Sequence, residues 1–300
     1  MQSAEIQRLL IYGQHIKSTE EYSYVLNLID ALQAHGYSYA FYEPFAAEIA
    51  RFGTITTTQT LLQTHDQLLQ FAPDAAIVLG GDGTILRSVT LIRDSNIPIL
   101  GINLGRLGFL ASVEKTLIPK AIYKLKHGLF TLVNRSLLQL KSNFPLFEDF
   151  AFGLNDFTVN RRDTSSMITV YVSIDGIPLH AYWADGLIIS TPTGSTGYSL
   201  SCGGPILFPD ASNFIITPVA PHNLTVRPVV IPDDKLISIR VEGRQDSFMC
   251  TLDSRYETFG RSHVIEITKA SFSIRFIQLE GQNFMHTLGE KLLWGRDKRN

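Results

Sequence analysis

The sequence lacks most of the features that would tie it to a membrane, to nucleic acid or to an oxidising compartment. Its 300 residues hold two cysteines, too few for a disulfide framework, and they form no C-x-x-C metal spacing. Lys and Arg number 26 against 28 Asp and Glu, so there is no basic excess to attract nucleic acid or anionic lipid. No run of about 18 apolar residues is present. We therefore expect a cytoplasmic protein with no nucleic-acid and no membrane partner.

Two further absences narrow the chemistry. Residues 1–5 do not begin a basic and then apolar leader, so no secretory signal is expected. The eight histidines show no His-x-x-x-His or His-x-His spacing, so no built-in metal is expected. What is present is an ordinary globular composition, with 45% hydrophobic and 18% charged residues, and a length typical of about two domains.

Strand and helix patterns alternate over residues 1–115. Glu20–Gln33 and Leu61–Phe71 carry apolar residues at helical spacing. Ala75–Leu79 is continuously apolar, as a strand buried on both faces of a parallel sheet is, and Ile97–Ile102 reads as the next strand. This alternation predicts an α/β N-terminal domain with a Rossmann-like parallel sheet.

Residues 116–282 have a different pattern, which predicts a mainly antiparallel β-sandwich domain. Two β-branched, alternating runs flank Asp175-Gly176, a strong hairpin signal. Further strand-like runs are punctuated by proline and glycine: Leu187–Ser190, Phe214–Val219, Val226–Ile231, Leu236–Val241, Val264–Thr268 and Phe272–Leu279. Asn283–Trp294 returns to helical spacing, and the pattern leaves open whether residues 283–300 pack back on the first domain.

The most informative motif is Gly80-Gly81-Asp82-Gly83-Thr84, between a predicted buried strand and a predicted helix. The glycines permit a tight turn and a close approach of ligand to backbone, and a helix start is favourable for phosphate. A carboxylate repels phosphate, so Asp82 needs another reason: it could hold a divalent cation or accept a proton from a hydroxyl nucleophile. The alternative is a plain turn in which Asp82 caps the helix.

The sequence contains neither of the two familiar nucleotide-binding loops. No Gly-Lys pair exists, as the P-loop requires, and Leu86 stands where the dinucleotide fingerprint needs its third glycine. A second glycine-rich stretch, Gly101–Leu110, leaves the next predicted strand, so Asn103 is expected at the same carboxyl edge of the sheet.

Two motifs in the second domain combine polar and aromatic groups. Asn155-Asp156 could read a base edge and a ribose diol, although the pair is also common in turns. Asp185–Pro205 is a strand followed by a hydroxyl-rich turn, in which Ser195 or Thr196 would cap a helix of about two turns. Tyr198 could stack on a purine or belong to the core. No Gly-x-Ser-x-Gly elbow is spelled, which argues against a serine hydrolase.

In order and spacing, Gly80–Thr84, Gly101–Leu110, Asn155-Asp156, Asp185–Pro205 and Pro221–Pro228 resemble the NAD kinase family. The resemblance implies a phosphotransferase that moves a phosphoryl group from ATP, or polyphosphate, to the 2′-hydroxyl of the adenosine ribose of NAD. It also implies a divalent cation (Mg²⁺), an α/β domain followed by an NAD-binding β-sandwich, and a homodimer or homotetramer.

By motif position, the resemblance implies a role for each polar residue. Asp82 would accept the proton of the 2′-hydroxyl, Asn155 would contact the adenine side and Asp156 the ribose hydroxyls. Asp185 would fix the nicotinamide side. The other residues expected to contact the dinucleotide or the donor are Gly81, Gly83, Thr84, Arg87, Asn103, Thr196, Gly197, Tyr198, Ser199, Ser201 and Arg255.

Three departures from the family pattern stand out: Asp156 replaces a usual Glu, Gly197 a usual Ala, and Trp183 a residue that is often basic or small. Two rival functions stay open from the sequence. One is a lipid kinase of the diacylglycerol kinase type, which shares the glycine loop but has Gly-Thr-x-Asn-Asp where this chain has Leu104–Phe109. The other is a non-catalytic NAD(P) sensor, which would be expected to lose the Asp82 carboxylate.

Overall fold

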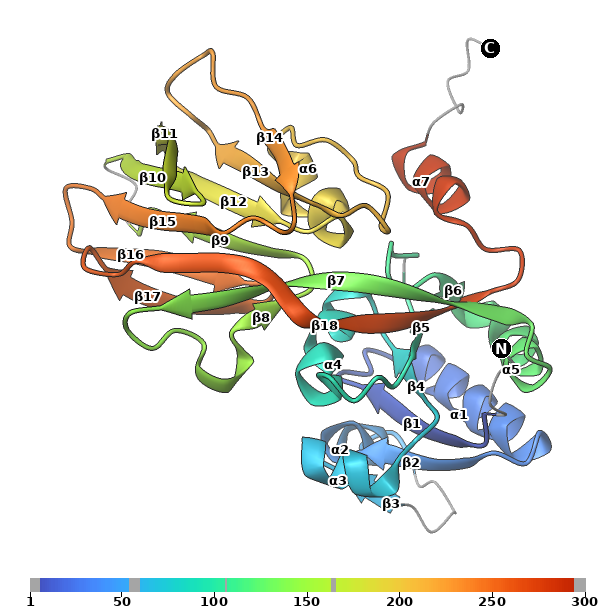
Figure 1. The fold of residues 1–300 in the computed structure, drawn as a ribbon. Coiled ribbons are helices and arrows are strands. Elements are labelled where there is room, and N and C mark those ends of the chain that lie inside the picture. The colour runs from blue at the N-terminus through green and yellow to red at the C-terminus, as the bar shows by residue number, and fades with distance from the viewer. Residues whose placement is uncertain (1–5, 54–59, 106, 163–165, 294–300) are drawn as a thin grey trace, which may run out of the picture. The chain divides into compact units, whose positions relative to one another are not determined.

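The computed structural model describes residues 6–53, 60–105, 107–162 and 166–293, which form two compact units (Figure 1). The first unit comprises residues 1–134 and 274–300, and the second comprises residues 135–273. Two long strands, β7 (Phe130–Ser142) and β18 (Ile265–Leu279), supply residues to both units. Trp294, the last residue of the predicted terminal helix, lies outside the described residues, as do residues 1–5 and 295–300.

The first unit is a parallel sheet with helices. Its strands follow the order β5-β4-β1-β2-β3, all parallel, and Phe276 of β18 pairs in parallel with Ile99 of β5. The elements are β1 (Arg8–Gly13), α1 (Thr19–Ala34), β2 (Ser38–Tyr42), α2 (Glu43–Ala50), β3 (Thr60–Leu62), α3 (His65–Phe71), β4 (Ala75–Leu79), α4 (Asp82–Ile92), β5 (Ile99–Asn103), β6 (Val113–Glu114), the 3-10 turn η1 (Lys115–Leu117), α5 (Ile118–Lys126) and α7 (Phe284–Leu292).

The core of this unit explains why the predicted strands form. Every residue of β4 is buried, as its unbroken apolar run predicts. Alternate residues of β4, such as Ile77, pack in one cluster with Leu28 of α1 and Ile122 of α5. A Cβ on Gly101 of β5 would overlap Ile85 of α4, so glycine lets this helix lie close to the sheet.

One helix prediction was partly wrong. The spacing of Leu61–Phe71 predicted a single helix, whereas Leu61 and Leu62 belong to β3 and α3 begins at His65. The reason is a capping box: the Thr64 hydroxyl accepts from the Gln67 amide, and the Gln67 side chain accepts from the Thr64 amide. The terminal helix is confirmed as α7, with Asn283 as its N-cap.

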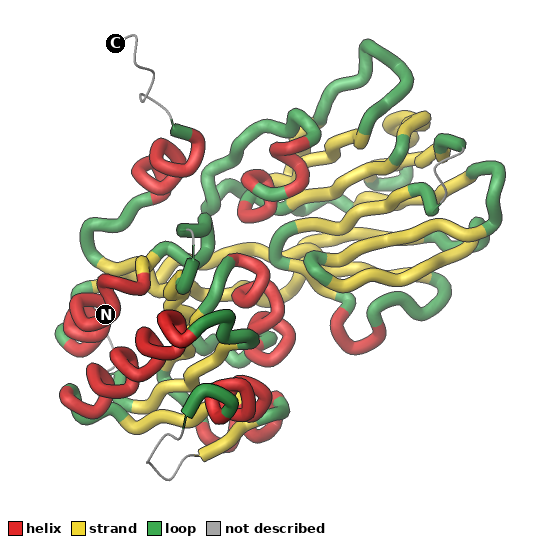
Figure 2. The backbone as a smooth tube through the Cα atoms, turned by 180° about the vertical axis from the view of Figure 1, so that it is seen from behind, coloured by secondary structure: helices red, strands yellow, loops and turns green. Residues whose placement is uncertain are grey.

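The second unit is a sandwich of two antiparallel sheets. One contains β11-β10-β15-β18 and the other β14-β13-β12-β9-β16-β17. Figure 2 shows that strands predominate here, whereas helices alternate with strands in the first unit. The remaining elements are η2 (Glu148–Phe150), β8 (Phe152–Gly153), β9 (Asp156–Asn160), β10 (Ile168–Ile174), β11 (Ile177–Ala184), β12 (Gly186–Ser190), η3 (Thr193–Thr196), α6 (Tyr198–Ser201), β13 (Asn213–Val219), β14 (Val229–Pro232), β15 (Ile237–Glu242), β16 (Ser247–Leu252) and β17 (Arg255–Gly260).

Alternation along the strands builds one core between the two sheets. Val170 and Ile239 from the first sheet share a buried cluster with Phe157, Ile189 and Phe248 from the second. The hairpin of β10 and β11 is confirmed: Asp175 and Gly176 both have positive φ, 50° and 80°, as a tight two-residue turn requires. The fold class predicted from the sequence, an α/β domain with a β-sandwich domain, is therefore confirmed.

Candidate active site

Asp82 is the first residue of α4, in the first unit, and its carboxylate holds a neighbouring loop. Its Oδ2 accepts from the Phe109 amide at 2.8 Å, and its Oδ1 accepts from the Leu110 and Ala111 amides at 3.1 and 3.0 Å. A carboxylate has about four acceptor positions, so three amides leave one, on Oδ2. The side chain is partly exposed. It does not cap its own helix, because the N-cap is Gly81, which has no side chain.

The glycines around Asp82 serve different purposes. A Cβ on Gly108 would overlap the Asp82 carboxylate, so glycine is required for this contact. Gly80 has a φ of 146°, which L side chains rarely adopt. Gly81 and Gly83 have no heavy atom within 4 Å of where a Cβ would stand, and both are exposed. The Gly81 and Gly83 positions at the start of α4 are thus open and free of neighbouring side chains.

Three other predicted residues belong to the same unit. Thr84 and Arg87 lie on α4, where Arg87 is exposed. Asn103, at the end of β5, is 3% exposed, and its Oδ1 accepts from the Gly105 amide at 2.7 Å, which shapes the start of the loop that Asp82 holds. Arg106, in that loop, lies outside the described residues. Lys291 of α7 places its ammonium 5.9 Å from the centre of the Phe109 ring.

In the second unit, the Asn155-Asp156 turn is held from both sides. The carboxylate of Asp253 accepts from three consecutive amides, those of Leu154, Asn155 and Asp156, at 2.9, 2.8 and 3.2 Å. On the other side, the Thr191 hydroxyl donates to the Leu154 carbonyl at 2.6 Å. The backbone of these residues is therefore fixed before any ligand binds.

The Asp156 side chain is a buried acid. It is 7% exposed, and its one hydrogen bond among the described residues comes from the Thr158 hydroxyl at 3.3 Å. Burial, together with the nearby Asp253 charge, raises the pKa of Asp156 to about 7. Buried carboxylates with such pKa values are frequent at functional sites.

The hydroxyl-rich segment folds differently from its prediction. A 3-10 turn, η3, occupies Thr193–Thr196, and α6 is one turn long with Gly197 as its N-cap, so the expected Ser195 or Thr196 cap and two-turn helix were wrong. The reason is that the Ser195 hydroxyl donates to the Pro192 carbonyl at 2.7 Å and is engaged there. A Cβ on Gly194 would overlap the Asn155 carbonyl, so this turn lies directly against the Asn155-Asp156 turn.

The predicted contact residues of this segment differ in how far they are exposed to solvent. Tyr198 is 43% exposed, and burial with the charges of Cys202, Asp156 and Asp185 raises the pKa of its hydroxyl. Ser199, in contrast, is fully buried, and its hydroxyl lies 2.8 Å from that of Thr217 inside the unit. Thr196 donates to the Thr193 carbonyl at 3.3 Å, and Ser201 is exposed.

Asp185 and Arg255 each have a protein partner. Asp185 pairs with Arg161 at 3.0 Å, with both side chains about 30% exposed. Arg255 donates from both terminal nitrogens to backbone carbonyls, those of Phe150 and Phe152, the latter at 2.5 Å. Trp183 lies against His222, with 4.3 Å between ring centres.

Among the buried polar atoms of the described residues that have no hydrogen-bond partner, two lie in the turns just described. They are Asn155 Oδ1 and Thr193 Oγ1. Unpartnered buried acceptors and hydroxyls cost free energy, and a bound polar ligand is one explanation for their presence. Sequence reasoning missed Thr193, although its position in the Thr191–Ser201 block, two residues from Ser195, could have indicated it. It missed Asp253 as well, whose carboxylate accepts from backbone amides that no motif records.

Two negative observations complete the site. Within the described ranges, no three His, Cys, Asp or Glu side chains are grouped so that they could hold a metal ion, and no helix is long and apolar enough to cross a membrane.

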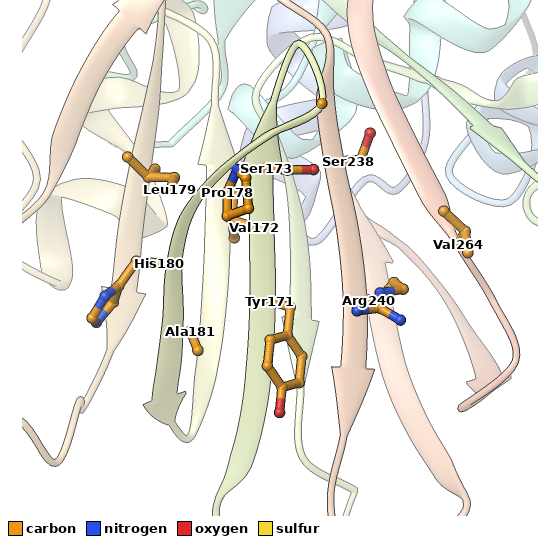
Figure 3. A pocket seen from close by; sticks show the side chains of 11 residues that line it. Tyr171, Val172, Ser173, Pro178, Leu179, His180, Ala181, Ser238, Arg240 and Val264 are labelled. Carbon is orange, nitrogen blue, oxygen red and sulfur yellow. The ribbon is translucent and has the colours of Figure 1, made fainter.

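A pocket of about 470 Å³ lies on the sheet face of β10, β11 and β15, lined by Tyr171, Leu179, His180, Ser238, Arg240 and Val264 among others (Figure 3). None of the predicted contact residues lines it.

Comparison with known proteins adds sequence and structural relatives. The model of the ATP-NAD kinase N-terminal domain matches residues 14–130, and that of the ATP-NAD kinase C-terminal domain matches residues 154–279. The NAD kinase of Flavobacterium psychrophilum is 43% identical over 295 residues, covering 98% of this chain and 100% of that protein. The NAD kinase of Christiangramia forsetii is 44% identical, covering 97% and 99%.

Two solved structures share the fold. Yeast NADH kinase, complexed with NADH, has a TM-score of 0.85 at 22% identity, covering 98% of this chain and 89% of that one. An NAD kinase from Archaeoglobus fulgidus, in complex with ATP, has a TM-score of 0.74 at 22% identity, covering 96% and 100%.

Proposed function

The chain belongs to the NAD kinase family, and from that premise we propose how its residues divide the work of phosphorylating NAD. It is a phosphotransferase with NAD kinase activity. We propose that the acceptor is the 2′-hydroxyl of the adenosine ribose, that ATP is the donor, and that Asp82 takes the proton. The observation that carries the proposal is the single unused acceptor position of the Asp82 carboxylate at the open start of α4.

The second unit supplies the dinucleotide contacts in this proposal. Asn155 Oδ1 and Thr193 Oγ1, both buried without a partner, would bind polar groups of NAD. Asp156, when ionised, accepts from ribose hydroxyls, and the exposed part of Tyr198 offers a ring for the base. Asp185 would lie at the nicotinamide side with Arg161 as its partner. Ser199 is the weakest member of the predicted set, because its hydroxyl is already bonded to Thr217.

The chemical step needs a base and positioning. The ribose hydroxyl donates to the free position on Asp82 Oδ2, and its proton passes to that carboxylate as its oxygen bonds to the terminal phosphorus of the donor. The bond from that phosphorus to the bridging oxygen breaks, and the proton later leaves Asp82 for water. The three loop amides fix the direction of the carboxylate, and such positioning lowers the barrier of the chemical step.

The residues present suit the phosphates of the donor better than they suit a divalent cation. Gly81, Gly83 and the amides at the start of α4 form an open surface that suits phosphate, with Thr84 and Arg87 on the same helix. For a divalent cation the fit is poor, because the described residues contain no cluster of carboxylates or histidines to hold one. We therefore propose that Mg²⁺ arrives with the donor phosphates, whose charge it offsets.

We further propose a cytoplasmic location and a homodimer or homotetramer, in line with the family. Neither rival function has support: the relatives are NAD kinases, and Asp82 is retained and held in place. The direct experiment incubates the pure protein with Mg²⁺, ATP or polyphosphate, and NAD, NADH or diacylglycerol in parallel. NADP is the expected product. Labelled phosphatidic acid, or bound NAD that yields no NADP, would contradict the proposal.

A further inference from the structure

Asp253 is a half-buried residue whose carboxylate accepts its hydrogen bonds from the turn that presents Asn155 and Asp156. It occupies the turn between β16 and β17, where its φ of 52° is unusual for a residue other than glycine. Antiparallel pairing of β16 with β9 brings this turn beside the start of β9, since Leu252 stands opposite Phe157. The Asp253 amide also donates to the Asp156 carbonyl at 3.0 Å.

The contacts of Asp253 fix both residues of the presenting turn. Its Oδ1 accepts from the Asn155 and Asp156 amides and its Oδ2 from that of Leu154, so three consecutive peptide groups point at one carboxylate. Such charge-assisted bonds are stronger than bonds between neutral groups. The Asn155 carbonyl, on the opposite side, accepts from the Thr191 amide at 2.9 Å. Asp253 therefore connects the β16–β17 hairpin to the hydroxyl-rich segment through the Asn155-Asp156 turn.

The same residue sets the electrostatic surroundings of Asp156. The groups that face Asp156 are the Thr158 hydroxyl on β9, the Tyr198 hydroxyl on α6, and Asp253, next to which lies Arg255. Burial raises the pKa of both carboxyls, but three amides and Arg255 act in the opposite direction on Asp253. Within the described ranges, the Asp156 carboxyl has only the bond from the Thr158 hydroxyl. Of the two, Asp156 is therefore the one that takes the proton as the pH falls.

We propose that Asp253 is a positioning residue for NAD: it fixes the Asn155-Asp156 turn through three amides, and its charge sets the pH range in which Asp156 accepts the ribose hydroxyls. Asp253 itself touches no substrate. This inference rests on the proposed function, since it assumes that Asp156 binds the ribose of NAD. It predicts that NAD affinity, rather than the rate of the chemical step, responds to changes at Asp253.

The test measures the KM for NAD and kcat from pH 6 to 9 at saturating ATP. In the native protein, the KM should fall as the pH rises through about 7, where Asp156 ionises. Asp253→Asn should move this midpoint to lower pH by about one pH unit or more, because a like charge is removed. It should also raise the KM about tenfold at pH 8.5, the effect of one lost charge-assisted bond, with kcat within about threefold.

Two more variants make the test decisive. Thr158→Val deletes the one hydroxyl bond to Asp156 and should move the midpoint to higher pH, which keeps the proposal testable if Asp253→Asn fails to fold. Glu257→Gln is the matched control: this carboxylate, on β17 of the same hairpin, also accepts a backbone amide, that of Phe147 at 2.9 Å, but accepts none from the Asn155-Asp156 turn. It should leave the midpoint in place.

Three results would overturn the inference. They are an unmoved midpoint in Asp253→Asn, an unmoved midpoint in Thr158→Val, and an equal fall in kcat and in kcat/KM with KM unchanged. Failure of the proposed function would look different, because the native protein would then make no NADP at any pH.

Discussion

Asp156→Asn is expected to stabilise the fold at alkaline pH while it weakens NAD binding. The folded protein raises the pKa of Asp156 from its ordinary 3.8 to about 7 by burial and by the Asp253 charge. A carboxyl whose pKa is higher in the folded state contributes stability below its unfolded pKa, and that stability is lost as the pH rises through the folded pKa. Asparagine, which never ionises, does not incur the loss.

The magnitude follows from the pKa difference. At about 1.36 kcal/mol for each pKa unit, the full effect is roughly 4 kcal/mol, an upper limit because burial energies relax. Between pH 5.5 and pH 8 the native protein loses the portion from 5.5 to about 7, roughly 2 kcal/mol. A change in hydrogen bonding to Thr158 contributes equally at both pH values and cancels in this comparison.

The assay is urea unfolding of both proteins at pH 5.5, 7 and 8, at one fixed protein concentration because assembly would shift the midpoint. The advantage of Asp156→Asn should grow by roughly 2 kcal/mol from the lowest pH to the highest. Asp149→Asn, an exposed aspartate in the same unit, is the matched control and should differ from the native protein by less than about 0.5 kcal/mol throughout. Parallel pH curves for Asp156→Asn and the native protein would refute the reasoning.

Three other substitutions test particular contacts. Gly108→Ala should lower kcat at least about tenfold, because its Cβ would overlap the Asp82 carboxylate, whereas Gly289→Ala, where a Cβ meets open space, should retain activity. Arg255→Ala should lower the free energy of unfolding by about 2 kcal/mol or more in urea titrations, because the Phe150 and Phe152 carbonyls lose their charged donors. An unchanged unfolding midpoint with a raised KM for NAD would instead assign Arg255 to the ligand. Gly197→Ala should keep the KM for NAD within about threefold, because its Cβ would lie 3.2 Å from the Gly194 carbonyl oxygen and 4.0 Å from Asp156 Oδ2; a larger rise would show that the turn cannot adjust.

Much of the fold was predictable because it follows from local patterns. The apolar run of β4 and the Asp175-Gly176 turn each carry their structure in a few adjacent residues. Ser247–Leu252 (β16) alternates between buried and half-buried residues and could have been predicted by the same rule, but was not. Val264–Thr268 and Phe272–Leu279 were expected as two strands, whereas Ile265–Leu279 forms one, β18, in which the exposed Lys269 pairs with Asp233.

The candidate site was predictable in its residues and not in its contacts. The glycine motif indicated Asp82, but its three bonds reach residues 27 to 29 positions further along the chain, in a loop without periodicity. The sequence pattern therefore could not show whether Asp82 caps its own helix or holds the loop at residues 109–111. Asp253 illustrates the same limit. It binds backbone amides, which every residue except proline has, so the sequence of its partners does not indicate the contact.

The central claim is that the Asp82 carboxylate takes the proton of the NAD ribose hydroxyl during phosphoryl transfer. The most direct measurement is single-turnover formation of NADP by Asp82→Asn with saturating ATP and Mg²⁺, alongside its dissociation constant for NAD from calorimetry. We predict a loss of at least about a hundredfold in the rate, with the dissociation constant within about threefold of the native value. A near-native rate of NADP formation would contradict the claim.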